Sequence, residues 1–223
     1  MQTKEKTTKI KWISYSVMFF ALFVSFTLLV ALSCRKPLVL GEKQITANSI
    51  DLLCFSLITS HTFWFVLTEI IGYLALFIAF CVSIYGVFSW IKTKSIKRIN
   101  PLVLASLIAF VITVLFYVAF EFIPINYRPI LIDGNLEKSY PSSHSLLIVV
   151  VSLTLKDILS EKIANKKIRI AINVVLIILI LFTLIGRILC ARHWVSDVIG
   201  GALLGLSIYY AFKAMAETFW NKN

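Results

Sequence analysis

Residues 186–212 read GRILCARHWVSDVIGGALLGLSIYYAF, a stretch that joins a cluster of ionisable residues to an apolar run. The apolar part, residues 194–212, is long enough to cross a bilayer, because a spanning helix needs about 20 apolar residues. This run contains one acid, Asp197, and it follows directly on His193. Ionisable groups at membrane depth are costly, so these residues indicate a functional site at one end of a membrane helix.

Five more apolar runs precede this one, at residues 12–32, 63–90, 101–120, 141–155 and 170–186. Hydrophobic residues make up 59% of the chain and charged residues 15%, whereas soluble domains have about 45–50% and about 25%. This composition excludes a soluble globular domain, and it also excludes a disordered chain. We predict an all-α fold, a bundle of six transmembrane helices that forms a single integral membrane domain over residues 1–223.

The basic residues indicate how the bundle is oriented. The net charge is +11, but the lysines and arginines gather in short clusters between apolar runs, and no nucleic-acid motif accompanies them. We therefore expect no nucleic-acid partner. The largest clusters lie before the first run and after the second and fourth, which predicts that these segments are cytoplasmic. Both termini are then cytoplasmic and residues 121–140 face outward from the cell membrane. We expect the first run to remain as a helix rather than be removed as a signal peptide.

Polar residues recur at the outward ends of the last four runs. Arg128 follows the third run, His144 lies near the start of the fourth, and Arg187 ends the fifth. His193 and Asp197 are four residues apart, so they share a helix face, and the carboxylate can fix the imidazole tautomer.

These residue types suit phosphoryl transfer. The N–H groups of a first helical turn, here at Ser142 and Ser143, bind phosphate oxygens, and guanidinium groups match phosphate with two hydrogen bonds. A histidine held by a carboxylate is a nucleophile. Each feature alone also has a structural explanation, since serine is a common N-cap and arginine near a span end often reaches the headgroups. Their joint occurrence at one membrane face favours an active site.

At these positions the chain resembles the type 2 phosphatidic acid phosphatase family, whose membrane domain is similar to acid phosphatases. The family pattern is Lys-x6-Arg-Pro, Pro-Ser-Gly-His and Ser-Arg-x5-His-x3-Asp. The chain has Glu121-x6-Arg128-Pro129, Pro141-Ser142-Ser143-His144 and Gly186-Arg187-x5-His193-x3-Asp197. The motifs cover residues 121–197 with the same order and spacing.

The resemblance implies an enzyme that hydrolyses a lipid phosphate or diphosphate, of the phosphatidate or polyprenyl type, without metal or other cofactor. His193 would be the nucleophile that forms a phosphohistidine, and Asp197 would orient it. His144 would protonate the leaving oxygen. The remaining implied role is phosphate binding, by Arg128, Arg187, Ser142 and Ser143.

The chain departs from the family pattern at three positions. Gly186 stands in place of serine and Ser143 in place of glycine. Glu121 stands in place of a phosphate-binding lysine, and a carboxylate there repels phosphate unless it is paired. We expect Glu121 to tune the substrate, paired with Arg128 or Arg192, or with Lys138 supplying the missing cation.

Two other functions stay open. His144, His193 and Asp197, with His61, have the residue types of a zinc-dependent membrane hydrolase. Alternatively, Glu121 indicates a lipid-binding or transport protein on a phosphatase scaffold that has lost catalysis.

Two minor features also stay open. Glu69, inside the second run, either supports the site arginines or makes an ordinary interhelical hydrogen bond, and we favour the second. Cys34 and Cys54 flank the first outward loop, where a disulfide is possible, but we expect unpaired thiols.

Overall fold

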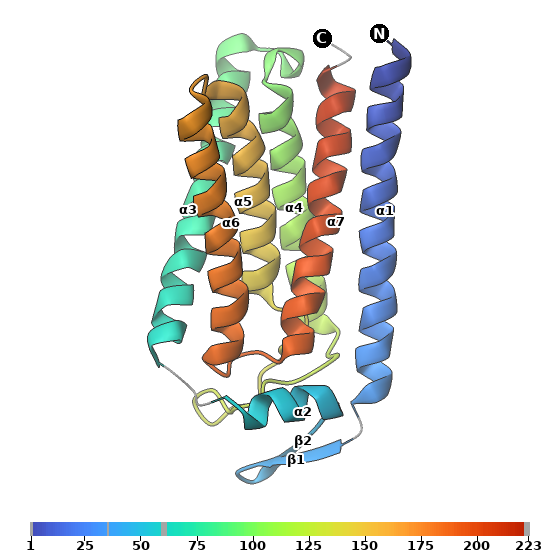
Figure 1. Cartoon of the computed structure of the whole chain (residues 1–223), viewed down its shortest axis with the longest axis vertical. Coiled ribbons are helices and arrows are strands. Elements are labelled where there is room, and N and C mark those ends of the chain that lie inside the picture. The colour runs from blue at the N-terminus through green and yellow to red at the C-terminus, as the bar shows by residue number, and fades with distance from the viewer. Residues whose placement is uncertain (1, 35, 59–61, 221–223) are drawn as a thin grey trace.

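The computed structural model describes residues 2–34, 36–58 and 62–220, and six long helices run side by side in it (Figure 1). All six are long and apolar enough to cross a membrane, which confirms the predicted spans and makes the chain a multi-pass membrane protein. The long helices are α1 (Gln2–Ser33), α3 (Thr62–Thr93), α4 (Pro101–Phe122), α5 (Ser143–Lys162), α6 (Lys166–Leu189) and α7 (Val195–Trp220). Between α1 and α3 lie strands β1 (Lys36–Leu40) and β2 (Lys43–Ala47) and helix α2 (Ser49–Ser56), and a 3-10 turn, η1 (Ile96–Arg98), precedes α4.

Polar side chains determine where three of the spans begin. Asn100 accepts hydrogen bonds from the first backbone N–H groups of α4, and Pro101 then occupies the first helical position. Asn165 caps α6 and Ser142 caps α5 in the same way. Such caps satisfy backbone donors that have no partner inside the helix. The cap at Ser142 fixes the start of the helix that carries His144.

Helices α5 and α7 form the centre of the bundle. Within the protein, 56% of the α5 span and 61% of the α7 span are buried, against 11–28% in the other four. These two helices also have the lowest mean hydropathy, 1.4 and 1.5, whereas the others reach at least 2.3. Polar groups are costly in contact with lipid, so the least apolar helices lie inside and the most apolar ones face the bilayer.

A small cap made of the β1–β2 hairpin and α2 covers one end of the bundle (Figure 1). Its buried residues Ile45 and Ala47 pack against Trp194, which directly follows His193. Asp51 of α2 is buried and accepts hydrogen bonds from the backbone N–H and the hydroxyl of Ser196, at 3.0 and 2.5 Å. The cap therefore holds the start of α7 in place. The sequence predicted only a loop here.

Helix α1 begins and α7 ends at the same end of the bundle, away from the cap (Figure 1). This arrangement agrees with the prediction that both termini lie on one side, and the prediction that this side is cytoplasmic remains a prediction. Cys34 and Cys54 are not joined by a disulfide.

Candidate active site

The predicted site residues come together at the capped end of the bundle. His193 lies in the turn between α6 and α7, and Arg128 lies in the loop between α4 and α5. His144 belongs to the first turn of α5, and Arg187 to the last turn of α6. Four separate segments therefore contribute to one site, as the sequence predicted.

Backbone hydrogen bonds join these segments directly. The N–H of Ser142 donates to the carbonyl of Asp197 at 2.9 Å, which ties the start of α5 to the first turn of α7. The N–H of His193 donates to the carbonyl of Arg187 at 3.3 Å. The indole N–H of Trp194 donates to the carbonyl of Tyr127 at 2.6 Å, which fixes the loop that carries Arg128. The frame of the site is therefore set by main-chain contacts, which sequence motifs do not reveal.

The imidazole of His193 is buried, and its Nδ1 atom is held by two oxygen atoms. Its Nδ1 lies 3.1 Å from the carbonyl oxygen of Ser139 and 3.5 Å from Oδ2 of Asp197. Both oxygens are acceptors, so Nδ1 carries the proton and Nε2 keeps a lone pair. Nε2 faces the Nη1 atom of Arg128 at 3.4 Å. Burial, and then the charges of Arg128 and Arg187, lower the pKa of His193 well below 6.5, so the imidazole is neutral near pH 7.

Asp197 contacts His193 as predicted, but His193 lies in the turn before α7, so the two residues do not share a helix face. Asp197 also has a second role. Its Oδ2 accepts a hydrogen bond from the backbone N–H of Trp194 at 2.9 Å, and the carboxylate is fully buried. It therefore caps the start of α7 while it faces His193. The shorter contact to His193 comes from the Ser139 carbonyl, which sequence analysis missed because a backbone oxygen has no signature in side-chain identity.

The two predicted phosphate-binding arginines are both held in place. Arg128 donates from Nη1 to the carbonyl of Arg192 at 3.0 Å, and its Nε lies 3.0 Å from the Glu137 carboxylate. Arg187 is buried, and its Nη1 lies 2.8 Å from Oε1 of Glu69 and 3.3 Å from Oγ1 of Thr68. Fixed guanidinium groups lose little conformational freedom when they bind an oxyanion.

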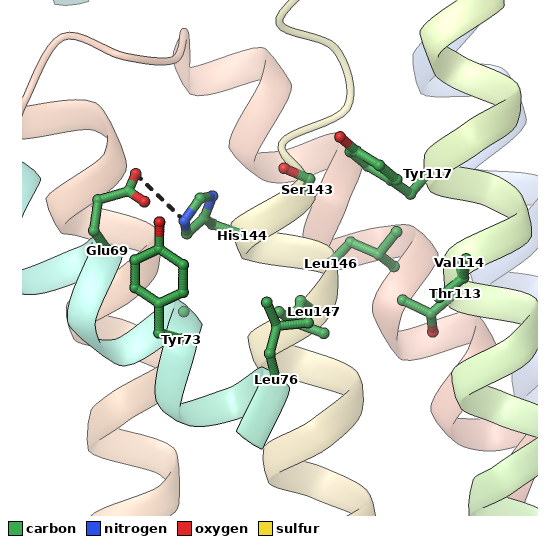
Figure 2. Close-up of a pocket in the computed structure, with 11 residues that line it drawn as sticks. Glu69, Tyr73, Leu76, Thr113, Val114, Tyr117, Ser143, His144, Leu146 and Leu147 are labelled. Carbon is green, nitrogen blue, oxygen red and sulfur yellow. Dashed lines mark ion pairs between the residues drawn. The ribbon is translucent and has the colours of Figure 1, made fainter. Parts of the chain in front are cut away.

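Glu69 has a larger part in the site than the sequence suggested. Besides Arg187, the same oxygen, Oε1, faces Nε2 of His144 at 3.5 Å (Figure 2). Glu69 therefore supports a site arginine, the alternative that we did not favour, and it also contacts His144. His61, the other polar residue considered near it, lies outside the described residues.

Ser142 and Ser143, the two serines predicted to bind phosphate at the start of α5, have different hydrogen-bonding roles. The Ser142 hydroxyl is buried and accepts hydrogen bonds from the N–H and hydroxyl of Ser145, so it is used inside α5. The first intrahelical hydrogen bond runs from the Leu146 N–H to the Ser142 carbonyl. The N–H groups of Ser143 and His144 precede it and are the donors that a helix start offers to an anion.

Glu121 does not pair with the arginines that the sequence suggested. Arg128 faces Glu137, and the Arg192 guanidinium lies over the Phe65 ring at 4.2 Å. Lys138, by contrast, donates from its ammonium group to the backbone carbonyl of Glu121. A cation therefore lies next to the residue where the family pattern has lysine, although it comes from a residue 17 positions later.

Two neighbouring cavities lead to these residues. An apolar cavity of about 360 Å³ lies between α3, α4 and α5, and His144 and Glu69 line one part of it (Figure 2). A recess of about 40 Å³ is lined by Glu121, Arg128, Lys138 and His193. Tyr117, Ser143 and Leu146 line both cavities, so an apolar chain and a polar group can be accommodated side by side.

Gly72 leaves the space that the His144 ring occupies. A Cβ at this position would lie 2.8 Å from Cδ2 and 2.9 Å from Nε2 of His144. We expect Gly72→Ala to displace the ring and lower turnover of a lipid phosphate by about 10²-fold, in line with the contribution of a general acid. Gly86→Ala in the same helix is the matched control, because its Cβ would meet Leu107 at 2.9 Å, away from the site. Equal losses in the two variants would contradict this explanation.

The residues suggested for a zinc site do not gather as a ligand set. Among the residues that the structure describes, no three His, Cys, Asp or Glu side chains are grouped so that they can hold a metal ion. His193 uses Nδ1 toward Ser139 and Asp197, and His144 faces Glu69. Donor geometry therefore gives no support to zinc binding by these residues.

The fold and the site together define a membrane phosphatase. Residues 119–221, which hold all three predicted motifs, match the family described as the PAP2 superfamily. The fold is similar to that of a transmembrane PAP2-type phosphatidylglycerolphosphate phosphatase from Bacillus subtilis, with a TM-score of 0.64 and 18% identity, over 92% of this chain and 96% of that chain. No curated protein sequence matches the chain.

Proposed function

We propose that the protein hydrolyses lipid phosphate monoesters through a phosphohistidine at His193, without a metal ion, at the outer face of the cell membrane. The observation that carries the proposal is the state of the imidazole. Its Nδ1 is bound by acceptors and its Nε2 keeps a lone pair beside Arg128. A buried, neutral and oriented imidazole is the form of histidine that acts as a nucleophile.

In the first step, Nε2 of His193 forms a bond to phosphorus while the bond between phosphorus and the lipid oxygen breaks. Arg128, Arg187 and the N–H groups at the start of α5 face the phosphoryl oxygens and stabilise the charge that develops on them. His144 gives its proton to the leaving lipid oxygen. In the second step, water attacks the phosphohistidine, His144 takes a proton from that water, and inorganic phosphate leaves.

The apolar cavity supports a lipid substrate. Its walls carry Leu76, Val114 and Leu147 (Figure 2). It adjoins the recess that His193 and Arg128 line. A hydrocarbon chain in this cavity keeps its apolar surface away from water. The recess is lined by Arg128 and Lys138 beside His193, so a phosphate group that enters it meets cations next to the nucleophile.

The outward orientation is supported by the distribution of basic residues. The connections between α3 and α4 and between α5 and α6 lie at the end where α1 begins (Figure 1). These connections and the helix ends beside them contain Lys92, Lys94, Lys97, Arg98, Lys166 and Lys167. Because basic segments stay in the cytoplasm, the opposite end, which holds the site, faces outward.

The function is tested by phosphate release from a panel of lipid phosphates in detergent micelles, with and without a chelator. The panel contains a phosphatidate, a phosphatidylglycerol phosphate and a polyprenyl diphosphate. We expect turnover of a monoester that the chelator does not change. Loss of activity with chelator would favour a metal-dependent hydrolase. Binding of the lipids without any turnover would favour a non-catalytic lipid-binding protein.

We expect Glu121→Lys to change substrate preference. The substitution removes a carboxylate from the recess and adds a cation beside Lys138 and Arg128. A second phosphate group would meet attraction instead of repulsion, so the ratio of kcat/KM for the diphosphate to that for the monoester should rise about tenfold, the effect of about 1.4 kcal/mol. Glu42→Lys, at the exposed tip of the hairpin, is the control for added charge. An unchanged ratio would show that Glu121 does not face the substrate.

A further inference from the structure

Glu69 is a carboxylate in the site that belongs to none of the three motifs. It lies on α3, before the residues that match the family, and it lines the apolar cavity with Gly72 and Tyr73 (Figure 2). Its Oε1 atom lies 2.8 Å from Arg187 and 3.5 Å from His144, which belong to two other helices. One oxygen atom therefore connects the phosphate-binding group with the proton donor.

The surroundings explain why a charge is retained at this depth. Arg187 is 2% exposed, and a buried guanidinium is costly unless a carboxylate faces it. Of the other acids near the site, Asp197 caps α7, Glu137 faces Arg128 from a more exposed position, and Glu121 lines the recess on the α4 side. Among the described residues, Glu69 is thus the carboxylate that pairs with the Arg187 guanidinium.

We propose that Glu69 is a positioning residue for proton transfer. It accepts a hydrogen bond from His144 and orients that ring toward the lipid oxygen. Its negative charge also offsets the repulsion between the Arg187 guanidinium and a protonated His144. In the acid step His144 is doubly protonated: its Nε2–H stays on Glu69, and the proton on Nδ1 moves to the leaving oxygen. Glu69 stays ionised beside Arg187 throughout. The role of Glu69 rests on the proposed function, because it acts through His144 in that reaction.

This role differs from that of a simple clamp for Arg187. A clamp supports phosphate binding, so its removal slows every phosphate ester by a similar factor. A residue that acts through the general acid matters most when the leaving group needs a proton. An alkoxide leaving from a lipid needs one, whereas p-nitrophenolate does not.

The test compares Glu69→Gln with wild type on two substrates in the same micelles, a phosphatidate and p-nitrophenyl phosphate. We expect kcat for the phosphatidate to fall about 10²-fold and kcat for the aryl ester less than tenfold, since general acid catalysis contributes about 10²–10⁴-fold. Glu69→Asp, which keeps the charge, should recover part of the phosphatidate rate. Glu42→Gln is the control for loss of an exposed acid, and it should match wild type on both substrates.

Equal losses on the two substrates would overturn the role in proton transfer and leave only a clamp. Thermal unfolding in detergent shows whether Glu69→Gln is folded, and if it is not, the comparison is made with Glu69→Asp, where the same bias toward the phosphatidate is required. Wild-type protein that turns over neither substrate would overturn the proposed function as well. Wild-type turnover with no substrate bias in either variant would overturn the role of Glu69 alone.

Discussion

His193→Ala is expected to lower phosphate release from a lipid phosphate by at least about 10³-fold, since loss of a nucleophile leaves only binding and charge stabilisation. The structure gives the reason. Nδ1 of His193 is bound to the Ser139 carbonyl and faces Asp197, and Nε2 is left beside Arg128. Alanine removes the atom that accepts phosphorus. The measurement is steady-state release of inorganic phosphate by purified protein.

A second readout separates loss of the nucleophile from loss of folding. Wild-type protein quenched during turnover of a radiolabelled substrate should carry label that is stable in base and lost in acid, as a phosphoramidate bond is. His193→Ala should carry none. His144→Ala is the matched control, because it removes a neighbouring imidazole but should still become labelled by p-nitrophenyl phosphate, whose leaving group needs no proton. Retained turnover or label in His193→Ala would rule out this histidine as the nucleophile.

The six spans were predictable because bilayer thickness imposes a length and a composition on each of them. The run at 141–155 looked short, and the structure extends that helix to Lys162. It tolerates Lys156 and Asp157 because these residues pair with each other, and Asp157 also pairs with Lys213 of α7. Because α5 lies at the centre of the bundle, its last turns can carry charged residues that pair within the protein. A search for apolar runs therefore underestimates its length.

The site was predictable where side-chain spacing determines geometry and not where the backbone does. His193 and Asp197 are four residues apart, and Asp197 in the first turn of α7 reaches back to His193 in the preceding turn. The Ser139 carbonyl reaches His193 only through the fold of the loop before α5, and Asp51 reaches Ser196 only through the cap. Neither contact leaves a periodic or spaced pattern in the sequence. Glu69 was visible as an acid in a span, but its partners on α5 and α6 depend on how helices pack.

Gly186 shows how packing can explain a departure from a family pattern. Family members have serine at this position, and its absence first suggests a lost contact to phosphate. In the structure, a Cβ at Gly186 would lie 2.6 Å from Cγ2 of Thr68 and 3.1 Å from Cε3 of Trp64. Thr68 is fully buried on α3, so it has little room to move. The glycine is therefore required by the neighbouring helix.

Gly186→Ser, which restores the family residue, is accordingly expected to lower activity. Overpacking of this kind costs about 1–3 kcal/mol, and the displaced atoms include Thr68, whose hydroxyl accepts a hydrogen bond from Arg187. We expect kcat/KM for a lipid phosphate to fall at least about tenfold, together with a lower unfolding temperature in detergent.

The compensating change is Thr68→Ser, which removes Cγ2 but keeps the hydroxyl that faces Arg187. Alone, it leaves a space the size of one methyl group and should cost about 1 kcal/mol of stability with little effect on kcat/KM. Combined with Gly186→Ser, it should restore most of the lost activity, which gives a coupling energy of about 1–3 kcal/mol in a double-mutant cycle. Activity above wild type in the double variant would mean that the restored hydroxyl contacts phosphate. Additive losses would mean that the clash with Thr68 is not the reason for glycine at this position.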